Sequence, residues 1–71
     1  MIVTIRTLAE LSQERREHEY WQLAQMAVKL YRNRGDVPTI RDAVLMVMGN
    51  IRLSGTTQDI HEIEIRASKQ R

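Results

Sequence analysis

Residues 35–44 read GDVPTIRDAV, and this stretch decides the fold because it ends one helix and starts another. Gly35 suits the left-handed backbone conformation that closes a helix. Pro38 cannot continue a helix and pushes the residue before it into an extended conformation. Thr39 is a good helix N-cap, and Asp42 stands at the reciprocal position of a capping box. The stretch therefore predicts a tight turn between two helices.

The segments on either side of this turn have the apolar periodicity of amphipathic helices. Thr7 and Glu10 form a predicted capping box, so the first helix is expected to run from there to about Asn33. Its residues 12–19 are polar on every face, and its apolar stripe then follows at Tyr20, Leu23, Ala24, Ala27 and Tyr31. A second helix is predicted from residue 40 to about residue 53, with helical spacing of Ile40, Ala43, Val44, Val47, Met48 and Ile51.

The two ends of the chain are predicted to form short elements. Residues 1–6 alternate and are rich in β-branched side chains, which fits a short strand. Ser54 and Gly55 end the second helix, and residues 56–59 offer another capping box. Residues 58–70 fit a short third helix and a terminal strand equally well, so both alternatives stay open.

The fold class expected is mainly α, in a single domain over residues 1–71 that is dimeric. A chain of 71 residues without cysteine has no disulfide to stabilise a small core. Apolar residues surround most of the second helix, which is typical of a helix buried on more than one side. Because one other long helix covers only one side, we expect a homodimer that buries Val44, Leu45, Met46, Val47 and Met48.

The sequence excludes several classes of function. It has no glycine-rich phosphate loop, no zinc spacing and no nucleophile elbow, and a domain this small has little room for a catalytic pocket. Glu14 and His18 have the spacing of a ligand pair but are interpreted as solvated side chains, and His61 is interpreted as a surface or packed residue. We therefore expect no enzyme, no metal and no cofactor. No apolar run is long enough to cross a bilayer, so a membrane partner is not expected and the chain is predicted to be cytoplasmic.

The basic residues gather around the helix junction and indicate a nucleic-acid contact. The net charge is only +2, but Arg34, Arg41 and Arg52 surround the junction. Backbone N–H groups at a helix start bind phosphate, which makes Thr39 a candidate at the second helix. Thr56 and Thr57 are candidates at the next helix start. Solvated surface arginines are the alternative interpretation of this pattern.

Two families of regulators resemble parts of this sequence. Residues 21–44, with RGDVPTIRDAV, are similar to the N-terminal DNA-binding part of Kfr-type plasmid proteins. That resemblance implies a helix-turn-helix with Thr56 and Thr57 near the recognition helix. The segment IVTIRT and the start of the second helix are similar to ribbon-helix-helix repressors, which implies that Thr4 and Arg6 read bases from a strand. The layout of two helices around RGD also resembles small biofilm-linked regulators of enteric bacteria.

The function expected from these patterns is a small dimeric DNA-binding regulator of bacterial transcription. The alternative is a non-enzymatic protein-binding adaptor or inhibitor, encoded by a mobile element, that modulates a larger bacterial regulator or enzyme. In that case residues 12–19 and Trp21 would dock the partner, because tryptophan is enriched at interaction hot spots.

Overall fold

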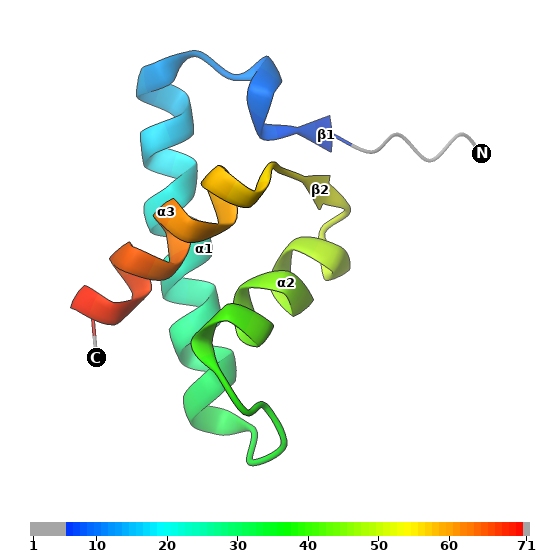
Figure 1. Cartoon of the computed structure of the whole chain (residues 1–71), viewed down its shortest axis with the longest axis vertical. Coiled ribbons are helices and arrows are strands. Elements are labelled where there is room, and N and C mark those ends of the chain that lie inside the picture. Colours follow the sequence, from blue (N-terminus) through cyan, green and yellow to red (C-terminus); the bar gives the residue numbers. More distant parts are fainter. Residues whose placement is uncertain (1–5, 71) are drawn as a thin grey trace.

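Three helices and a pair of two-residue strands form the structure, a computed structural model that describes residues 6–70 (Figure 1). The prediction of a mainly helical chain is confirmed. In chain order the elements are β1 (Arg6–Thr7), the 3-10 helix η1 (Leu8–Glu10), α1 (Gln13–Asn33), α2 (Ile40–Asn50), β2 (Leu53–Ser54) and α3 (Thr57–Lys69).

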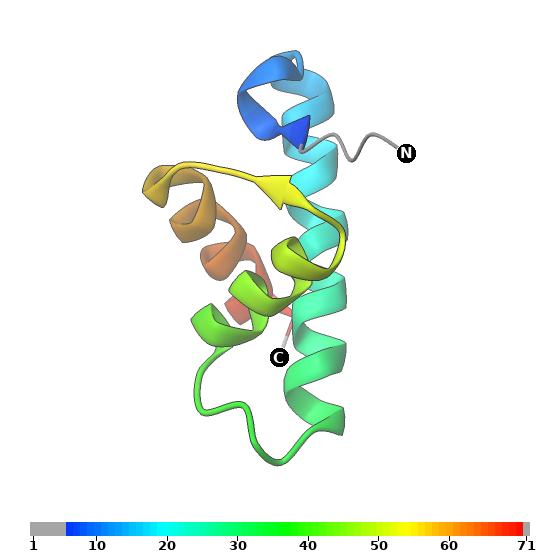
Figure 2. The same cartoon turned by 90° about the vertical axis from the view of Figure 1, so that its right-hand side faces the viewer.

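The helix α1 contacts both other helices, and α2 and α3 also pack against each other (Figures 1 and 2). The strands β1 and β2 pair in parallel, with Arg6 opposite Leu53 and Thr7 opposite Ser54. This pairing brings the start of the described chain to the connection between α2 and α3. The loop between α1 and α2 lies at the other end of the molecule (Figure 1).

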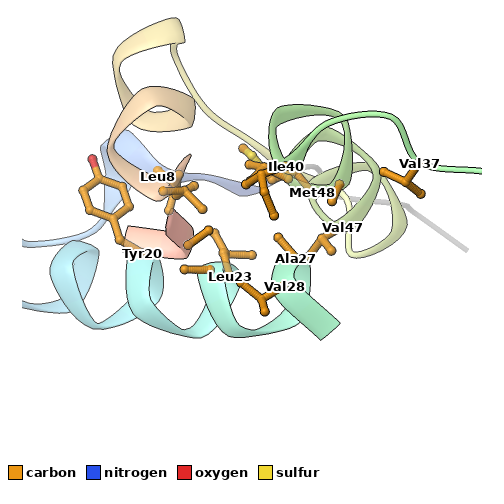
Figure 3. Packing of buried hydrophobic residues seen from close by; sticks show 14 residues of the cluster. Leu8, Tyr20, Leu23, Ala27, Val28, Val37, Ile40, Val47 and Met48 are labelled. Atoms are coloured by element: carbon orange, nitrogen blue, oxygen red, sulfur yellow. The ribbon is translucent and has the colours of Figure 1, made fainter. Parts of the chain in front are cut away.

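One hydrophobic core joins all three helices and the 3-10 turn. Leu8, Leu23, Val44 and Ile63 are its largest fully buried side chains. Figure 3 shows the cluster extending from Tyr20 and Leu8 at one end to Val37 at the other. The residues of the two predicted apolar stripes supply most of this core, as expected for the buried faces of amphipathic helices.

The first helix starts later than predicted. Thr7 precedes η1 without a side-chain cap bond, and α1 begins after Ser12, whose hydroxyl accepts from the backbone N–H of Arg15 at 3.3 Å. The break allows Leu8 to turn into the core. The Arg16 guanidinium then donates to the carbonyl oxygens of Leu8 at 3.2 Å and Leu11 at 3.0 Å. The Leu8 carbonyl also accepts the Leu11 N–H at 3.1 Å, whereas the Leu11 carbonyl is one that a continuous helix would have paired within its own backbone.

The second helix ends earlier than predicted. It stops at Asn50 rather than near Leu53, and Leu53 belongs to β2. Arg52 has a φ of 56°, and a residue in this left-handed region cannot continue a right-handed helix. The strand pairing of Leu53 with Arg6 is a contact between distant parts of the sequence, so the local pattern did not indicate it.

The alternatives for the C-terminal residues are resolved in favour of a helix. Thr56 and Asp59 form the predicted capping box at the start of α3, with both reciprocal bonds present. At the start of α2, the Thr39 hydroxyl accepts from the Asp42 N–H at 3.1 Å and donates to the Asp42 carboxylate at 3.0 Å. The Asp42 side chain therefore bonds the cap hydroxyl and not the backbone N–H that a capping box would use.

The third helix covers part of the predicted dimer interface. Val44, Val47 and Met48 are buried within the single chain, because α3 covers α2 on a second side. Leu45 is exposed and Met46 is half-buried. Of the five interface residues predicted, these two leave the most surface for another chain to cover. The homodimer itself stays a prediction.

Candidate functional site

The residues predicted to contact DNA lie at two opposite ends of the molecule. Arg34, Thr39 and Arg41 are at the loop between α1 and α2, whereas Arg52, Thr56 and Thr57 are at the connection that leads from α2 to α3 (Figure 1). The fold therefore does not gather them into one cluster. The helix α2 joins the two groups.

At the loop, Arg34 is engaged within the chain. Its guanidinium donates to both carboxylate oxygens of Asp36, at 2.9 Å and 2.7 Å. The bond to Asp36 raises the pKa of Arg34, and the bond from Arg34 holds the pKa of the Asp36 carboxyl below its usual range. The pair is exposed, so solvent weakens it, but the acid still offsets the charge that Arg34 would offer to a phosphate.

Acidic side chains also occupy the starts of α2 and α3. The Asp42 carboxylate bonds the Thr39 hydroxyl, and the Asp59 carboxylate accepts from the Thr56 N–H at 2.8 Å and from its hydroxyl at 3.1 Å. A carboxylate at a helix N-terminus takes the place that a phosphate would occupy. The Thr56 cap is therefore closed by Asp59, and at α2 the negative charge of Asp42 beside Thr39 disfavours a phosphate. Thr57 is an exposed residue in the first turn of α3.

Arg41 and Arg52 differ from Arg34 because neither guanidinium forms an ion pair or a hydrogen bond with another described residue. Both are exposed, and they lie at opposite ends of α2. Arg41, Leu45 and Gly49 follow at four-residue spacing along the outer face of this helix, and all three are exposed. The structure thus presents an outer α2 face with an unpaired arginine at each end.

Of the two residues of the predicted base-reading strand, Thr4 lies outside the described residues. Arg6 belongs to β1, which pairs with β2 of the same chain.

A buried polar network between α1 and α3 is a feature that sequence reasoning missed. The Tyr20 hydroxyl donates to the Asp59 carboxylate, which also holds the Thr56 cap. Burial and this bond raise the pKa of Tyr20 to about 12. Burial alone would raise the pKa of Asp59, but the bonds from Tyr20 and Thr56 outweigh it, so this pKa lies below its usual range. The network stabilises the junction of α1 and α3.

Trp21, the predicted partner anchor, packs beside a second polar cluster. Arg66 places its guanidinium carbon 5.8 Å from the centre of the Trp21 ring and 4.9 Å from that of Tyr20. The same guanidinium pairs with Glu17 at 2.6 Å and Glu62 at 2.8 Å. These bonds lower the pKa values of both carboxyls, and the bond to Glu17 is the largest cause of a raised pKa of Arg66. The Trp21 side chain stays 38% exposed.

The histidines and carboxylates do not assemble into a metal site. No group of three or more His, Cys, Asp or Glu side chains with suitable geometry occurs among residues 6–70. Glu14 and His18 are exposed on α1, and His61 is exposed on α3. No helix in this part of the chain is long and apolar enough to cross a membrane.

An apolar groove lies between α1 and α2 on the described surface. It has a volume of about 360 Å³. Met26, Leu30, Val47 and Ile51 supply its apolar lining. In the sequence, Met26 and Leu30 lie beside the stripe of the first helix, whereas Val47 and Ile51 belong to the stripe of the second. A comparison with protein-family models finds no match to this chain, and searches of curated proteins and of solved structures likewise find none.

Proposed function

We propose that the chain is a small homodimeric DNA-binding regulator of transcription, which contacts DNA through the outer face of α2. The observation that supports this proposal is the pair Arg41 and Arg52, both exposed and both without an acidic partner in the described structure. Free arginines near a duplex bind phosphates and release counterions, which supplies most of the affinity for DNA.

The two arginines flank a helix whose length fits a major groove. The 11 residues of α2 span about 16 Å at a rise of 1.5 Å per residue, with Arg41 in the first turn and Arg52 just after the last. The major groove is about 12 Å wide, so a helix lying in it reaches phosphates on both sides. Leu45 then faces the base edges, where an apolar side chain contacts the thymine methyl group. Arg34, Thr39 and Thr56 contribute less in this proposal because carboxylates already engage them.

Binding to DNA from around the gene of this protein, measured by fluorescence anisotropy at two salt concentrations, tests the proposal. The double variant Arg41→Ala, Arg52→Gly should weaken binding to all sequences and reduce the salt slope by about two, because each lost phosphate contact lowers it by about one. Glycine is chosen at position 52 because the backbone there has a positive φ.

The matched control is the double variant Arg15→Ala, Lys69→Ala, which removes the same net charge from exposed positions on α1 and α3. This control should leave the salt slope unchanged. An equal loss of DNA affinity in both double variants would show that only net charge matters. Absence of binding by the unmodified chain at low salt would refute DNA binding altogether. A loss confined to a Thr4→Ala, Arg6→Ala variant would replace the α2 proposal with the strand-reading alternative.

A protein-binding adaptor is the second candidate, and the exposed apolar side chains favour it. Trp21, Leu45 and Ile65 are all more than a third exposed. Of these three, Trp21 is the residue type enriched at interaction hot spots. Affinity capture from a bacterial lysate treated with nuclease distinguishes this candidate. A stoichiometric protein partner that is lost in a Trp21→Ala variant supports it, whereas nuclease-sensitive recovery of DNA alone contradicts it.

A further inference from the structure

Two neighbouring hollows on the α1–α2 side of the molecule meet at Ile51, which lines both of them. The first hollow, of about 130 Å³, is also lined by Glu10, Glu19 and Leu53. The second, of about 360 Å³, is also lined by Met26 and other apolar residues and by Lys29. We call the two hollows together the Ile51 groove.

The apolar part of the Ile51 groove is open to water. Met26 and Ile51 are each 43% exposed, and the neighbouring Leu11 and Leu30 are only partly buried. Covering such surface is favourable by roughly 25 cal/mol per Å². A partner that fits here therefore gains from burying apolar surface as well as from charge.

The charges that line the Ile51 groove are segregated. Glu10 and Glu19 line one end, where no cation lines the hollow, and Lys29 lines the other, where no acid does. None of the three forms an ion pair within the described chain. Glu19 and Lys29 are both on α1, ten residues apart, which corresponds to about 15 Å along the helix. Ile51 contributes to both ends of the groove.

We propose that a second copy of this chain occupies the Ile51 groove and forms a homodimer about a twofold axis that passes near Ile51. A twofold interface applies the same patch twice, so residue i of one copy meets residue j of the other, and the reverse. With the two α1 helices antiparallel, Glu19 of each copy faces Lys29 of the other. The acidic end thus meets the basic end twice, and the two Ile51 side chains are covered at the centre.

This inference rests on the homodimer of the proposed function but not on DNA binding. Of the interface residues predicted from the sequence, the groove retains Val47, whereas Val44 and Met48 are buried within the chain. Arg41 and Leu45 do not line the groove, so the outer α2 face stays available to DNA in the dimer. Sedimentation velocity without DNA therefore tests the interface, and its outcome is independent of the DNA-binding assay.

The first test replaces the central apolar residue. The Ile51→Lys variant should weaken the dimer at least tenfold, because it places two like charges at the twofold axis. Leu45→Lys is the matched control, since Leu45 is 45% exposed on the outer face of α2. This substitution should leave the molecular mass measured by sedimentation at that of the dimer. Circular dichroism checks that both variants keep the helical content of the unmodified chain. A monomeric unmodified chain at 100 µM, or equal weakening by both variants, would overturn the proposal.

The second test reverses the charges. Glu19→Lys alone and Lys29→Glu alone should each weaken the dimer, because each creates two like-charge contacts across the axis. An equimolar mixture of these two variants should dimerise as well as the unmodified chain, since both cross-axis pairs then have opposite charges. The chain that has both substitutions should also recover. Failure of both the mixture and the double variant to recover would overturn the proposed pairing.

Discussion

The Tyr20 hydroxyl donates a hydrogen bond to the Asp59 carboxylate across the junction of α1 and α3. Asp59 is the buried charged residue of the described core, and it also receives the Thr56 backbone N–H and hydroxyl at the start of α3. One carboxylate thus caps a helix and joins it to the helix beside it. Burial of a charge requires such partners, because an unpaired carboxylate in the core is costly.

Replacing Tyr20 with phenylalanine should destabilise the protein by about 1–3 kcal/mol, since Asp59 then loses one of its buried donors. The aromatic ring and its contact with Arg66 stay in place, so the variant isolates the hydroxyl. Urea unfolding followed by circular dichroism measures the free energy. If Tyr20→Phe unfolds at the same urea concentration as the unmodified chain, the Tyr20–Asp59 bond contributes nothing measurable.

The stability of the protein should fall in acid, and Asp59 should account for part of the fall. The pKa of Asp59 is lower in the folded chain than its ordinary value of 3.8. The unfolded state therefore binds a proton at a higher pH than the folded state does. The contribution is complete above the unfolded pKa and is lost as the pH falls through the folded pKa.

Urea unfolding between pH 7 and pH 2 compares the unmodified chain with Asp59→Asn. The free-energy difference between the two should shrink as the pH decreases below about 4, the ordinary range of an aspartate pKa. Glu17 and Glu62 also have lowered pKa values and add to the total slope, but both variants share them. A difference that is constant over the whole range would contradict the assigned direction of the Asp59 shift.

Local sequence patterns predicted the helices much better than the ends of the helices. The turn at Gly35 and Pro38, the apolar stripe of α2 and the capping box at Thr56 all depend on residues that are close in the chain, and the structure contains each of them. The left-handed conformation predicted for Gly35 is wrong, because its φ is not positive and Arg34, the C-cap of α1, has an extended backbone. The end of α2 depends instead on Arg52, an arginine in a left-handed conformation that no local preference indicates. Its neighbour Leu53 pairs with Arg6, a contact across 47 positions.

The candidate site was predictable only in its residue types. Arg34 and Arg41 looked equivalent in the sequence, but Asp36 pairs with Arg34 and not with Arg41. The Ile51 groove needs α1 and α2 side by side, and this packing follows from tertiary contacts. A single sequence indicates the faces of each helix but not the partner that each face meets.

Arg66 should prove to be a packing residue as much as a charged one. It is only 13% exposed while it pairs with Glu17 and Glu62 and covers the rings of Tyr20 and Trp21. Arg66→Ala should cost about 1–3 kcal/mol, because two carboxylates lose their charged donor and the apolar stem no longer covers the rings. Unfolding in urea measures this loss.

Lysine should not restore the stability at position 66, because an ammonium cannot make the forked contacts with the two Glu17 oxygens at 2.7 Å and 2.6 Å. Trp21 is the one tryptophan of the chain, so its fluorescence reports this site directly. The emission of Arg66→Ala in the folded state should shift to longer wavelength. Full stability in Arg66→Lys together with an unchanged emission in Arg66→Ala would show that Arg66 is a solvated surface residue.

Replacing Gly49 and Gly55 with alanine should change the stability of the protein in opposite directions. A Cβ atom added at Gly55 would lie 3.0 Å from the Leu8 side chain, 3.0 Å from that of Met48 and 3.1 Å from the Cβ of Asp59. These contacts are too short, so Leu8 and the start of α3 must shift. Overpacking of this kind costs about 1–3 kcal/mol, and we expect Gly55→Ala to destabilise within this range.

Gly49 is the matched control, because an added Cβ meets nothing within 4 Å and the residue lies inside α2. Alanine loses less backbone entropy than glycine in a helix, so Gly49→Ala should stabilise by about 0.5–1 kcal/mol. Thermal unfolding of both variants side by side gives the two signs in one experiment. If Gly55→Ala melts at or above the temperature of the unmodified chain, the close approach of Leu8 to the connection before α3 does not occur in solution.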